Sequence, residues 1–317
     1  MKLKSKKSCH LDVLVQEFLK QHLDRSRPVL LGLSGGADSL ALFHLLLRYR
    51  DRWGLDLHIA HVDHRWRSES ALEAAQIQSW GQQLNLPVHI KVLQDGKPTH
   101  NAEDIARQAR LAFFDLVCEE TGGQAVMLGH HADDLAETVL KRLFESAAVT
   151  RVCGLRPVSD VEGIVLWRPL LKAQKRELLT FLQNHEVTYF EDSTNCDPKY
   201  LRTRLRNDLL PQLSTAFGKD ISAGLCSLGE ECEDICDYLD ERTRVYLEQG
   251  LEVDLSGCKY EVEVKHVLRQ LCRRAGFSLS REALKDACQQ VLAGSFKKQF
   301  MTGRHSVLVH GGKVKIQ

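Results

Sequence analysis

Residues 29–41, VLLGLSGGADSLA, place two glycines and two serines around one aspartate, between an apolar strand-like run and an apolar helix-like run. Adjacent glycines allow the backbone to turn sharply and to approach a ligand closely, and the amides that open the following helix point into the turn. Ser34 and Ser39 add hydroxyl donors for phosphate oxygens, whereas Asp38 suits this position only if Mg²⁺ lies between it and a phosphate. The stretch therefore predicts a site for a nucleoside triphosphate and its metal ion; an ordinary Gly-Gly turn is the alternative interpretation.

Strand-like and helix-like runs alternate after this loop. Ligands bind at the carboxyl ends of the strands in a parallel sheet, and the motifs SGGADS, HVDHRWR and GHHADD each begin where a predicted strand ends. One crevice is therefore expected to collect all three motifs. The alternation predicts an α/β fold, a parallel sheet with helices on both faces. Further strands are predicted at 56–64, 87–93 and 124–131, and helices at 40–50, 69–84, 102–120 and from Ala132 onward.

The alternation ends near Pro211. Beyond it, three helical patterns and a short β-rich end replace the strand-helix units. We therefore predict two domains, a nucleotide-binding domain at residues 1–215 and a smaller, mainly helical domain at residues 216–317. The expected helices of the second domain lie at 219–248, 261–275 and 280–293, and the β-rich end at 305–316.

The composition is that of an ordinary globular protein: 317 residues, of which 43% are hydrophobic and 27% charged. No apolar stretch approaches the roughly 20 residues that span a bilayer, and the amino terminus lacks a signal-peptide pattern. These features predict a cytoplasmic protein with no membrane partner. The chain has ten cysteines but no CxxC motif, and the closest pair is Cys232 and Cys236. The cysteines are therefore expected to be reduced thiols rather than metal ligands. The net charge of +1 means that any contact with RNA must rest on local clusters.

Histidines and acids gather in GHHADDLAET, residues 129–138. Asp134 and Glu137 are three residues apart and share a helix face, so they offer two carboxylates to an ammonium group or a metal ion. A helix N-cap followed by acids that stabilise the helix dipole is the alternative interpretation of the aspartates. That alternative does not account for His130 or His131.

Two further motifs carry basic residues. HVDHRWR, residues 61–67, places Arg67 after the second strand, and a solvated loop is the alternative interpretation. NAEDIARQARLAFF, residues 101–114, places Arg107 and Arg110 one helical turn apart, where they suit a carboxylate or a phosphate. Ion pairs along the helix surface are the alternative there.

The densest basic run is KYLRTRLR, residues 199–206, in which a tyrosine accompanies the lysine and the arginines. Such a run fits a strip that follows RNA phosphates beside an aromatic stacking residue. A solvated helix face is the alternative interpretation. A second basic group in the predicted helical domain is made by Arg269, Arg273 and Arg274.

The SGGADS loop lacks the Gly-Lys-Ser/Thr ending of the Walker pattern and resembles the PP-loop of the N-type ATP pyrophosphatases. Those enzymes hold the β,γ-pyrophosphate as a leaving group and transfer AMP to a substrate oxygen. Together with VDHRWR, NAEDIARQARLAFF, GHHADDLAETVLKRL, RPLLKAQKREL (168–178) and DSTNCDPKYLRTRLRNDLLPQL (192–213), the loop is similar, in order and spacing, to the tRNA(Ile)-lysidine synthetases. In that family ATP adenylates the C2 oxygen of the wobble cytidine in a CAU anticodon, and the ε-amine of free lysine then displaces AMP.

The resemblance implies domain functions, partners and residue roles. Residues 1–215 are expected to form the PP-loop ATP-binding catalytic domain, and residues 216–317 the domain that binds tRNA. The partners are ATP, Mg²⁺, free L-lysine and tRNA(Ile) with a CAU anticodon, and the sequence is compatible with a homodimer. Arg110 suits the carboxylate of lysine, whereas Asp134 and Glu137 suit its ammonium groups, with Asp134 a candidate proton acceptor; which acid acts as the general base stays open. The residues expected to bind ATP are Ser34, Gly35, Gly36, Ala37, Asp38, Ser39 and His61, with Asp38 also the Mg²⁺ ligand. The residues expected to bind substrate are Arg67, Arg110, His130, His131, Asp134 and Glu137. The residues expected to be catalytic are Asp38, Arg110 and Asp134. The residues expected to bind RNA are Lys199, Arg202, Arg204, Arg206, Arg273 and Arg274.

The chain departs from the family pattern in two places. Trp66 stands where the family usually has leucine, and FESAAVT, residues 144–150, stands where it usually has a Gly-Ser-Gly element. The chain is expected to resemble the short members, which lack an extra carboxy-terminal domain. A PP-loop tRNA thiolase is one alternative, against which the missing CxxC argues. An ATP-binding regulator or a degenerate RNA-binding protein is another, against which the acids Asp38, Asp134 and Glu137 argue.

Overall fold

The computed structural model describes residues 9–66, 68–93, 96, 98, 102–145, 148–190, 199–294 and 297–317, apart from the side chain of Glu103. The chain divides into two units by its internal contacts. The first comprises residues 1–146 and 154–229, and the second comprises residues 147–153 and 230–317. The functional division expected at residues 215 and 216 stays a prediction.

Six strands form the sheet of the first unit, in the order β3-β2-β1-β4-β6-β5. β1 pairs in parallel with β2 and β4, β2 with β3, and β4 with β6, whereas β5 pairs antiparallel with β6. The predicted α/β fold with a mostly parallel sheet is thus confirmed, and the β5–β6 hairpin at its edge was not predicted. β2 and β3 lie on one side of β1 in the sheet, and β4 lies on its other side. The direction in which the chain adds strands therefore reverses between β1 and β4, and ligands bind at the carboxyl ends of the strands at such a switch point. The strands are β1 (Val29–Gly32), β2 (Leu57–Asp63), β3 (Val88–Val92), β4 (Ala125–Met127), β5 (Val158–Val161) and β6 (Ile164–Trp167).

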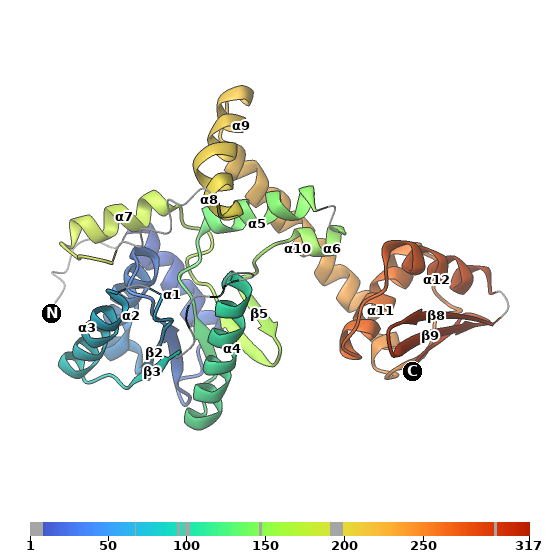
Figure 1. The fold of residues 1–317 in the computed structure, drawn as a ribbon, viewed down its shortest axis with the longest axis horizontal. Coiled ribbons are helices and arrows are strands. Elements are labelled where there is room, and N and C mark those ends of the chain that lie inside the picture. Colours follow the sequence, from blue (N-terminus) through green and yellow to red (C-terminus); the bar gives the residue numbers. More distant parts are fainter. Residues whose placement is uncertain are drawn as a thin grey trace. The chain divides into compact units, whose positions relative to one another are not determined.

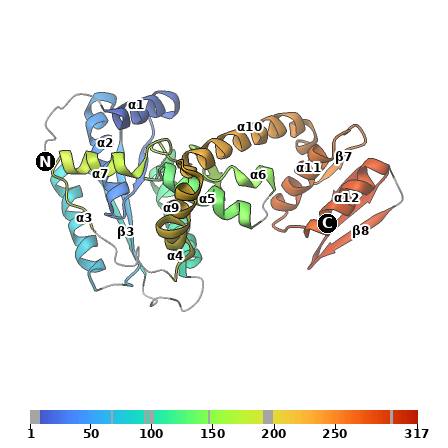
Figure 2. The same ribbon diagram turned by 90° about the horizontal axis from the view of Figure 1, so that it is seen from above.

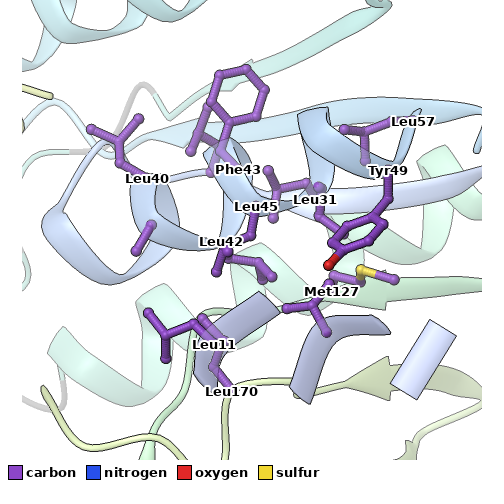
Figure 3. Close-up of a cluster of buried hydrophobic side chains, with 14 of the residues drawn as sticks. Leu11, Leu31, Leu40, Leu42, Phe43, Leu45, Tyr49, Leu57, Met127 and Leu170 are labelled. Carbon is purple, nitrogen blue, oxygen red and sulfur yellow. The ribbon is translucent and has the colours of Figure 1, made fainter. Parts of the chain in front are cut away.

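Helices cover both faces of this sheet (Figure 1). Val29 and Leu31 of β1 belong to one buried cluster, whereas Leu30, which points to the opposite face, belongs to another. Figure 3 shows the larger cluster, in which side chains of α1 and α2 pack against strand residues such as Leu31 and Met127. The larger cluster involves α1 (His10–His22), α2 (Ala37–Trp53), α3 (Ser70–Leu84) and α7 (Lys175–Asn184), and the other involves α4 (Ala102–Thr121).

Short helices complete the first unit. α5 begins directly after β4, and its N-cap His131 shares a capping box with Asp134. A five-residue π-helix, η2, interrupts the helical segment that carries the basic run. The elements are α5 (Ala132–Phe144), α8 (Leu201–Arg204), η2 (Leu205–Leu209), α9 (Leu210–Phe217) and the start of α10 (Ile221–Leu247).

The second unit packs two helices on a four-stranded antiparallel sheet of order β7-β10-β9-β8. Its core joins apolar residues of α11 and α12 with alternate residues of the strands, such as Val307 and Val309. Figure 2 shows the helices and strands of this unit. The predicted helices and the β-rich end are confirmed. The elements are α6 (Val149–Val152), β7 (Glu252–Asp254), α11 (Glu261–Arg274), α12 (Arg281–Ala293), β8 (Lys298–Thr302), β9 (His305–His310) and β10 (Lys313–Ile316), with the remainder of α10. Across the described residues of both units, helices that combine the length and the apolar character needed to cross a bilayer are absent.

Candidate active site

The loop between β1 and α2 needs glycine at its centre. Gly35 has a φ of +81°, a left-handed conformation that side chains other than glycine rarely adopt. A Cβ atom on Gly35 would lie 2.2 Å from Cδ2 of Phe190, and the backbone amide of Phe190 donates to the carbonyl of Gly35 at 2.9 Å. The ring and the backbone amide of Phe190 therefore stabilise the loop in addition to the turn at Gly35.

Serine hydroxyls brace the same loop from inside. The hydroxyl oxygens of Ser34 and Ser39 lie 3.0 Å apart, and the Ser39 hydroxyl donates to the carbonyl of Gly36 at 3.1 Å. Buried His61 of β2 donates from Nδ1 to the carbonyl of Leu33 at 2.8 Å, and burial lowers the pKa of this imidazole. The amides of the first turn of α2 thus open into a preformed cradle, as an anion site requires. The structure places His61 against the loop backbone, and its direct contact with ATP stays a prediction.

Asp38, in the first turn of α2, is the acid of this cradle. Its carboxylate forms an ion pair with the ammonium of Lys175, and Nε2 of His131 lies 3.6 Å from Oδ1. Burial acts to raise the pKa of Asp38, but His131 and Lys175 outweigh burial and hold the pKa below its ordinary value. A Cβ atom on Gly129 would lie 2.7 Å from the carbonyl oxygen of Asp38, so the end of β4 packs directly against this turn.

His131 is a buried cation among acids. Its side chain is 1% exposed, with Asp133 Oδ2 at 3.3 Å from Nδ1 and Asp134 Oδ2 at 3.4 Å from Nε2. Burial favours the neutral imidazole, but Asp133, Asp38 and Asp134 outweigh burial and raise the pKa of His131 to about 9. The neighbouring His131 imidazolium lowers the pKa of Asp133 to about 2. The structure thus places His131 beneath the site, where it joins the start of α5 to the phosphate loop.

The two acids expected to receive lysine face two arginines of the basic run. Arg202 reaches Glu137 Oε2 from Nε at 2.9 Å and Asp134 Oδ1 from Nη2 at 3.3 Å. Arg206 reaches Glu137 Oε1 from Nε at 2.5 Å and Asp134 Oδ1 from Nη2 at 3.0 Å. The carboxylates are buried, whereas the arginine side chains are 48% and 40% exposed. The structure therefore brings together residues that the sequence assigned to lysine and to RNA.

The other predicted RNA-binding residues have contacts of their own. The Lys199 ammonium sits 5.1 Å from the centre of the Tyr200 ring, and Arg204 donates from Nη1 to the carbonyl of Lys199 at 3.0 Å. In the second unit Arg273 is exposed, and Arg274 donates to the carbonyl of Leu247 at 2.6 Å. RNA binding by these residues stays a prediction.

Arg110, His130 and Arg67 complete the predicted substrate set. Arg110 is exposed on α4, and among the described residues it has no ion pair with Asp134 or Glu137. His130 is half-buried at the end of β4, where Nε of Arg168 donates to its Nδ1 at 3.2 Å. Arg67 lies outside the described residues.

Lys175, Phe190 and Arg168 were not predicted as site residues. Lys175 is the first residue of α7, and a cation is unfavourable at a helix N-terminus unless an acid compensates for it. A lysine at the first position of a helix is therefore a sequence signal that an acid lies nearby in the fold. The backbone amide of Lys175 also donates to Asp133 Oδ2 at 2.9 Å. Arg168 and Phe190 gave no comparable signal, because only the fold brings them to the loop and to His130.

Comparisons with known proteins identify several similar chains. A family model described as a PP-loop domain matches residues 8–213. The tRNA(Ile)-lysidine synthase of Protochlamydia amoebophila is 35% identical over 306 residues, which cover 94% of this chain and 67% of that protein. The synthase of Chlamydia muridarum is 38% identical over 74% of this chain and 72% of its own length, and that of Chlamydia caviae is 32% identical over 96% and 98%.

Among solved structures, the U34-tRNA thiolase NcsA from Methanococcus maripaludis, determined with its [4Fe-4S] cluster, superposes with a TM-score of 0.58. It covers 72% of this chain and 78% of its own, at 19% sequence identity. This likeness shows a shared fold.

Proposed function

This chain belongs to the tRNA(Ile)-lysidine synthases, and from that premise we propose that it joins free lysine to C2 of the wobble cytidine in the CAU anticodon of tRNA(Ile). Membership confirms the resemblance that the motifs indicate. In the proposed reaction, the C2 oxygen of the cytidine attacks the α-phosphorus of ATP and pyrophosphate leaves. The ε-amine of lysine then attacks C2, AMP leaves with the oxygen, and lysidine remains.

One observation carries this proposal. A preformed phosphate cradle and a buried pair of carboxylates, Asp134 and Glu137, lie at neighbouring strand ends on either side of the switch point of one sheet. His131 contacts both Asp38 and Asp134, which ties the two parts into one site. A triphosphate and an ammonium-bearing substrate are the ligands that these two parts fit.

ATP and Mg²⁺ fit the loop residues. The amides at the start of α2 and the Ser34 and Ser39 hydroxyls suit phosphate oxygens, and the carboxylate of Asp38 suits a Mg²⁺ ion that phosphates also ligate. When bound, Mg²⁺ would offset the charge of the triphosphate. Lys175, which is paired with Asp38 in the structure, is proposed to contact the same phosphates and to neutralise the departing pyrophosphate.

Lysine is proposed to bind between Arg110 and the two acids. Asp134 and Glu137 present buried oxygen atoms that suit ammonium groups, and exposed Arg110 suits the carboxylate. Arg202 and Arg206 hold the same oxygen atoms, so lysine must compete with them. Asp134 is the proposed proton acceptor when the amine attacks C2.

The experiment that tests this function is incorporation of radiolabelled lysine into tRNA, with pyrophosphate release measured in the same reaction. We expect both products only with ATP and a tRNA that bears the CAU anticodon, and the label on the wobble nucleotide. Pyrophosphate release that depends on a sulfur donor, and not on lysine, would identify a thiolase instead. ATP binding without pyrophosphate release on any tRNA would identify a regulator.

A further inference from the structure

Arg168, directly after β6, is buried and yet contacts only neutral groups in the hydrogen bonds found among the described residues. Its side chain is 4% exposed, and Nη1 donates to the carbonyl of Arg156 and to the Ser159 hydroxyl, each at 2.8 Å. Its Nε donates to Nδ1 of His130 at 3.2 Å. Burying a guanidinium without a carboxylate partner is costly, and the described residues give Arg168 none. The hydrogen bonds that Arg168 donates are therefore the feature that its burial serves.

These contacts fix the tautomer of His130. A guanidinium has donors only, so Nδ1 of His130 must be the acceptor, and the proton of the neutral ring must sit on Nε2. Among the described residues, Nε2 of His130 has no hydrogen-bond partner, and the side chain is half-buried. One donor of this imidazole is therefore available to a ligand.

The position of His130 indicates which ligand. It follows Gly129, which packs against the Asp38–Ser39 peptide at the start of α2, and it precedes the acid pair of α5 by one turn. His130 thus stands in the chain between the glycine that packs against the phosphate cradle and the acids of α5. In the proposed reaction the α-phosphate is the group that joins the nucleotide to the substrate, so it is the ligand that suits this position.

We propose that Arg168 is a positioning residue, which holds the proton of His130 on Nε2 so that His130 donates a hydrogen bond to the α-phosphate during adenylation and AMP departure. This inference rests on the proposed function. The β5–β6 hairpin acquires a role in it, because Arg156 and Ser159, before and within β5, hold the guanidinium in place.

The charges around the ring agree with a neutral donor. Burial and the cations Arg168, Arg202 and Arg110 outweigh the carboxylate of Asp134 and lower the pKa of His130 to about 4. The ring is therefore neutral in the physiological range, and its tautomer decides whether Nε2 carries a proton.

The first test measures the tautomer without substrates. In ¹⁵N NMR of histidine-labelled protein, the resonances of His130, assigned by their loss in His130→Gln, should show the proton on Nε2. A proton on Nδ1 would overturn the inference. Because no substrate is present, this result is independent of whether the enzyme makes lysidine.

The second test removes the guanidinium with Arg168→Met. The substitution removes the donor that requires Nδ1 of His130 to be an acceptor, so the proton of the ring is no longer held on Nε2. We expect kcat for pyrophosphate release at pH 8 to fall about 100-fold, the usual cost of one preorganised donor, with little change in KM for ATP. Arg50→Gln, which removes a donor to the Leu84 carbonyl at the far end of α2, is the matched control and should keep normal activity.

Rescue by a conservative variant separates positioning from a merely structural role. Lysine, like arginine, has donors only, so an ammonium at residue 168 that reaches Nδ1 of His130 keeps the proton on Nε2. We therefore expect kcat for Arg168→Lys to exceed that for Arg168→Met by about tenfold. Equal kcat values for the two variants would refute the proposal.

If Arg168→Met fails to fold, substitution of His130 itself decides. Glutamine places its amide donor near the position of Nε2, whereas asparagine places it near Nδ1. His130→Gln should therefore retain more activity than His130→Asn. The opposite order would refute a donor role for Nε2.

Discussion

Glu137→Gln keeps the shape of a buried side chain and removes one negative charge from the proposed lysine pocket. In the structure Glu137 faces Arg206 at 2.5 Å and Arg202 at 2.9 Å, and Asp134 faces the same two arginines. The substitution therefore tests two quantities at once, the affinity for lysine and the stability of the cluster.

The effect on stability should be moderate. Removing one partner of a buried ion pair costs about 3–5 kcal/mol when the other charge is left buried. Here the arginine side chains are 48% and 40% exposed and keep Asp134 as a partner, so water and Asp134 compensate for most of the loss. We expect about 1–2 kcal/mol of lost unfolding free energy, and a Tm lower by roughly 2–8 °C.

The effect on lysine should be large. Losing one desolvated charge partner costs about 2–5 kcal/mol of affinity, which corresponds to a rise in KM for lysine of about 30- to 4,000-fold. Arg202 and Arg206 compete for the same carboxylate and are weakened too, so we expect the lower end of this range. KM for ATP should change by less than about twofold, because the phosphate cradle is untouched.

Initial rates of labelled-lysine incorporation, measured across lysine and ATP concentrations, provide the assay. Glu145→Gln is the control, because Glu145 at the end of the same helix is 58% exposed and pairs only loosely with Lys141, at 3.7 Å. An equal rise in both KM values, or a lower Tm with an unchanged KM for lysine, would refute the assignment of Glu137 to lysine.

Three further predictions follow from the charges of the site and of the basic run. Asp38→Ala should abolish pyrophosphate release while leaving Tm within a few degrees; substantial turnover would refute its role with Mg²⁺. Lys199→Ala and Arg204→Ala should each weaken tRNA binding and shrink the slope of log affinity against log salt by about 0.7–0.9, without relaxing the preference for CAU; an unchanged slope would place the RNA surface elsewhere. The pKa of His131, about 9, lies above its ordinary value of about 6.5, so its stabilising contribution is complete below pH 6.5 and disappears as the pH rises through 9. The Tm difference between wild type and His131→Asn should therefore shrink from pH 7 to pH 10, and a constant difference would contradict this.

Most of the fold follows from local pattern. Strands β1 to β4 lie within the predicted runs, because each is a short apolar segment bounded by polar or glycine residues. The β5–β6 hairpin was not predicted, because β5, VSDV, interrupts its apolar residues with a serine and an acid, although β6, IVLW, is apolar throughout. Its turn contains Glu162 and Gly163, both with positive φ, and Glu-Gly is a weaker signal for such a turn than Asn-Gly or Asp-Gly.

In the candidate site, too, some residues could be identified from the sequence, whereas some contacts depend on the fold. The loop residues 34–39 are adjacent in the chain, so their shared role was readable from the sequence. The Lys175–Asp38 pair joins residues 137 positions apart, and the arginines reach Asp134 and Glu137 across 65 to 72 positions. A basic run shows that cations are present, but only the fold decides whether a given arginine meets solvent, RNA or an internal carboxylate.

The resulting balance of charge explains how so many acids share one site. Four carboxylates, Asp38, Asp133, Asp134 and Glu137, face the cations Lys175, His131, Arg202 and Arg206, so the described cluster is close to neutral. Each ligand of the proposed reaction must then replace one partner of an existing ion pair. Phosphates would pair with Lys175 and the arginines, and ammonium groups or Mg²⁺ would pair with the acids. Because every buried charge keeps a partner through such an exchange, the site avoids the cost of an unpaired charge at each step.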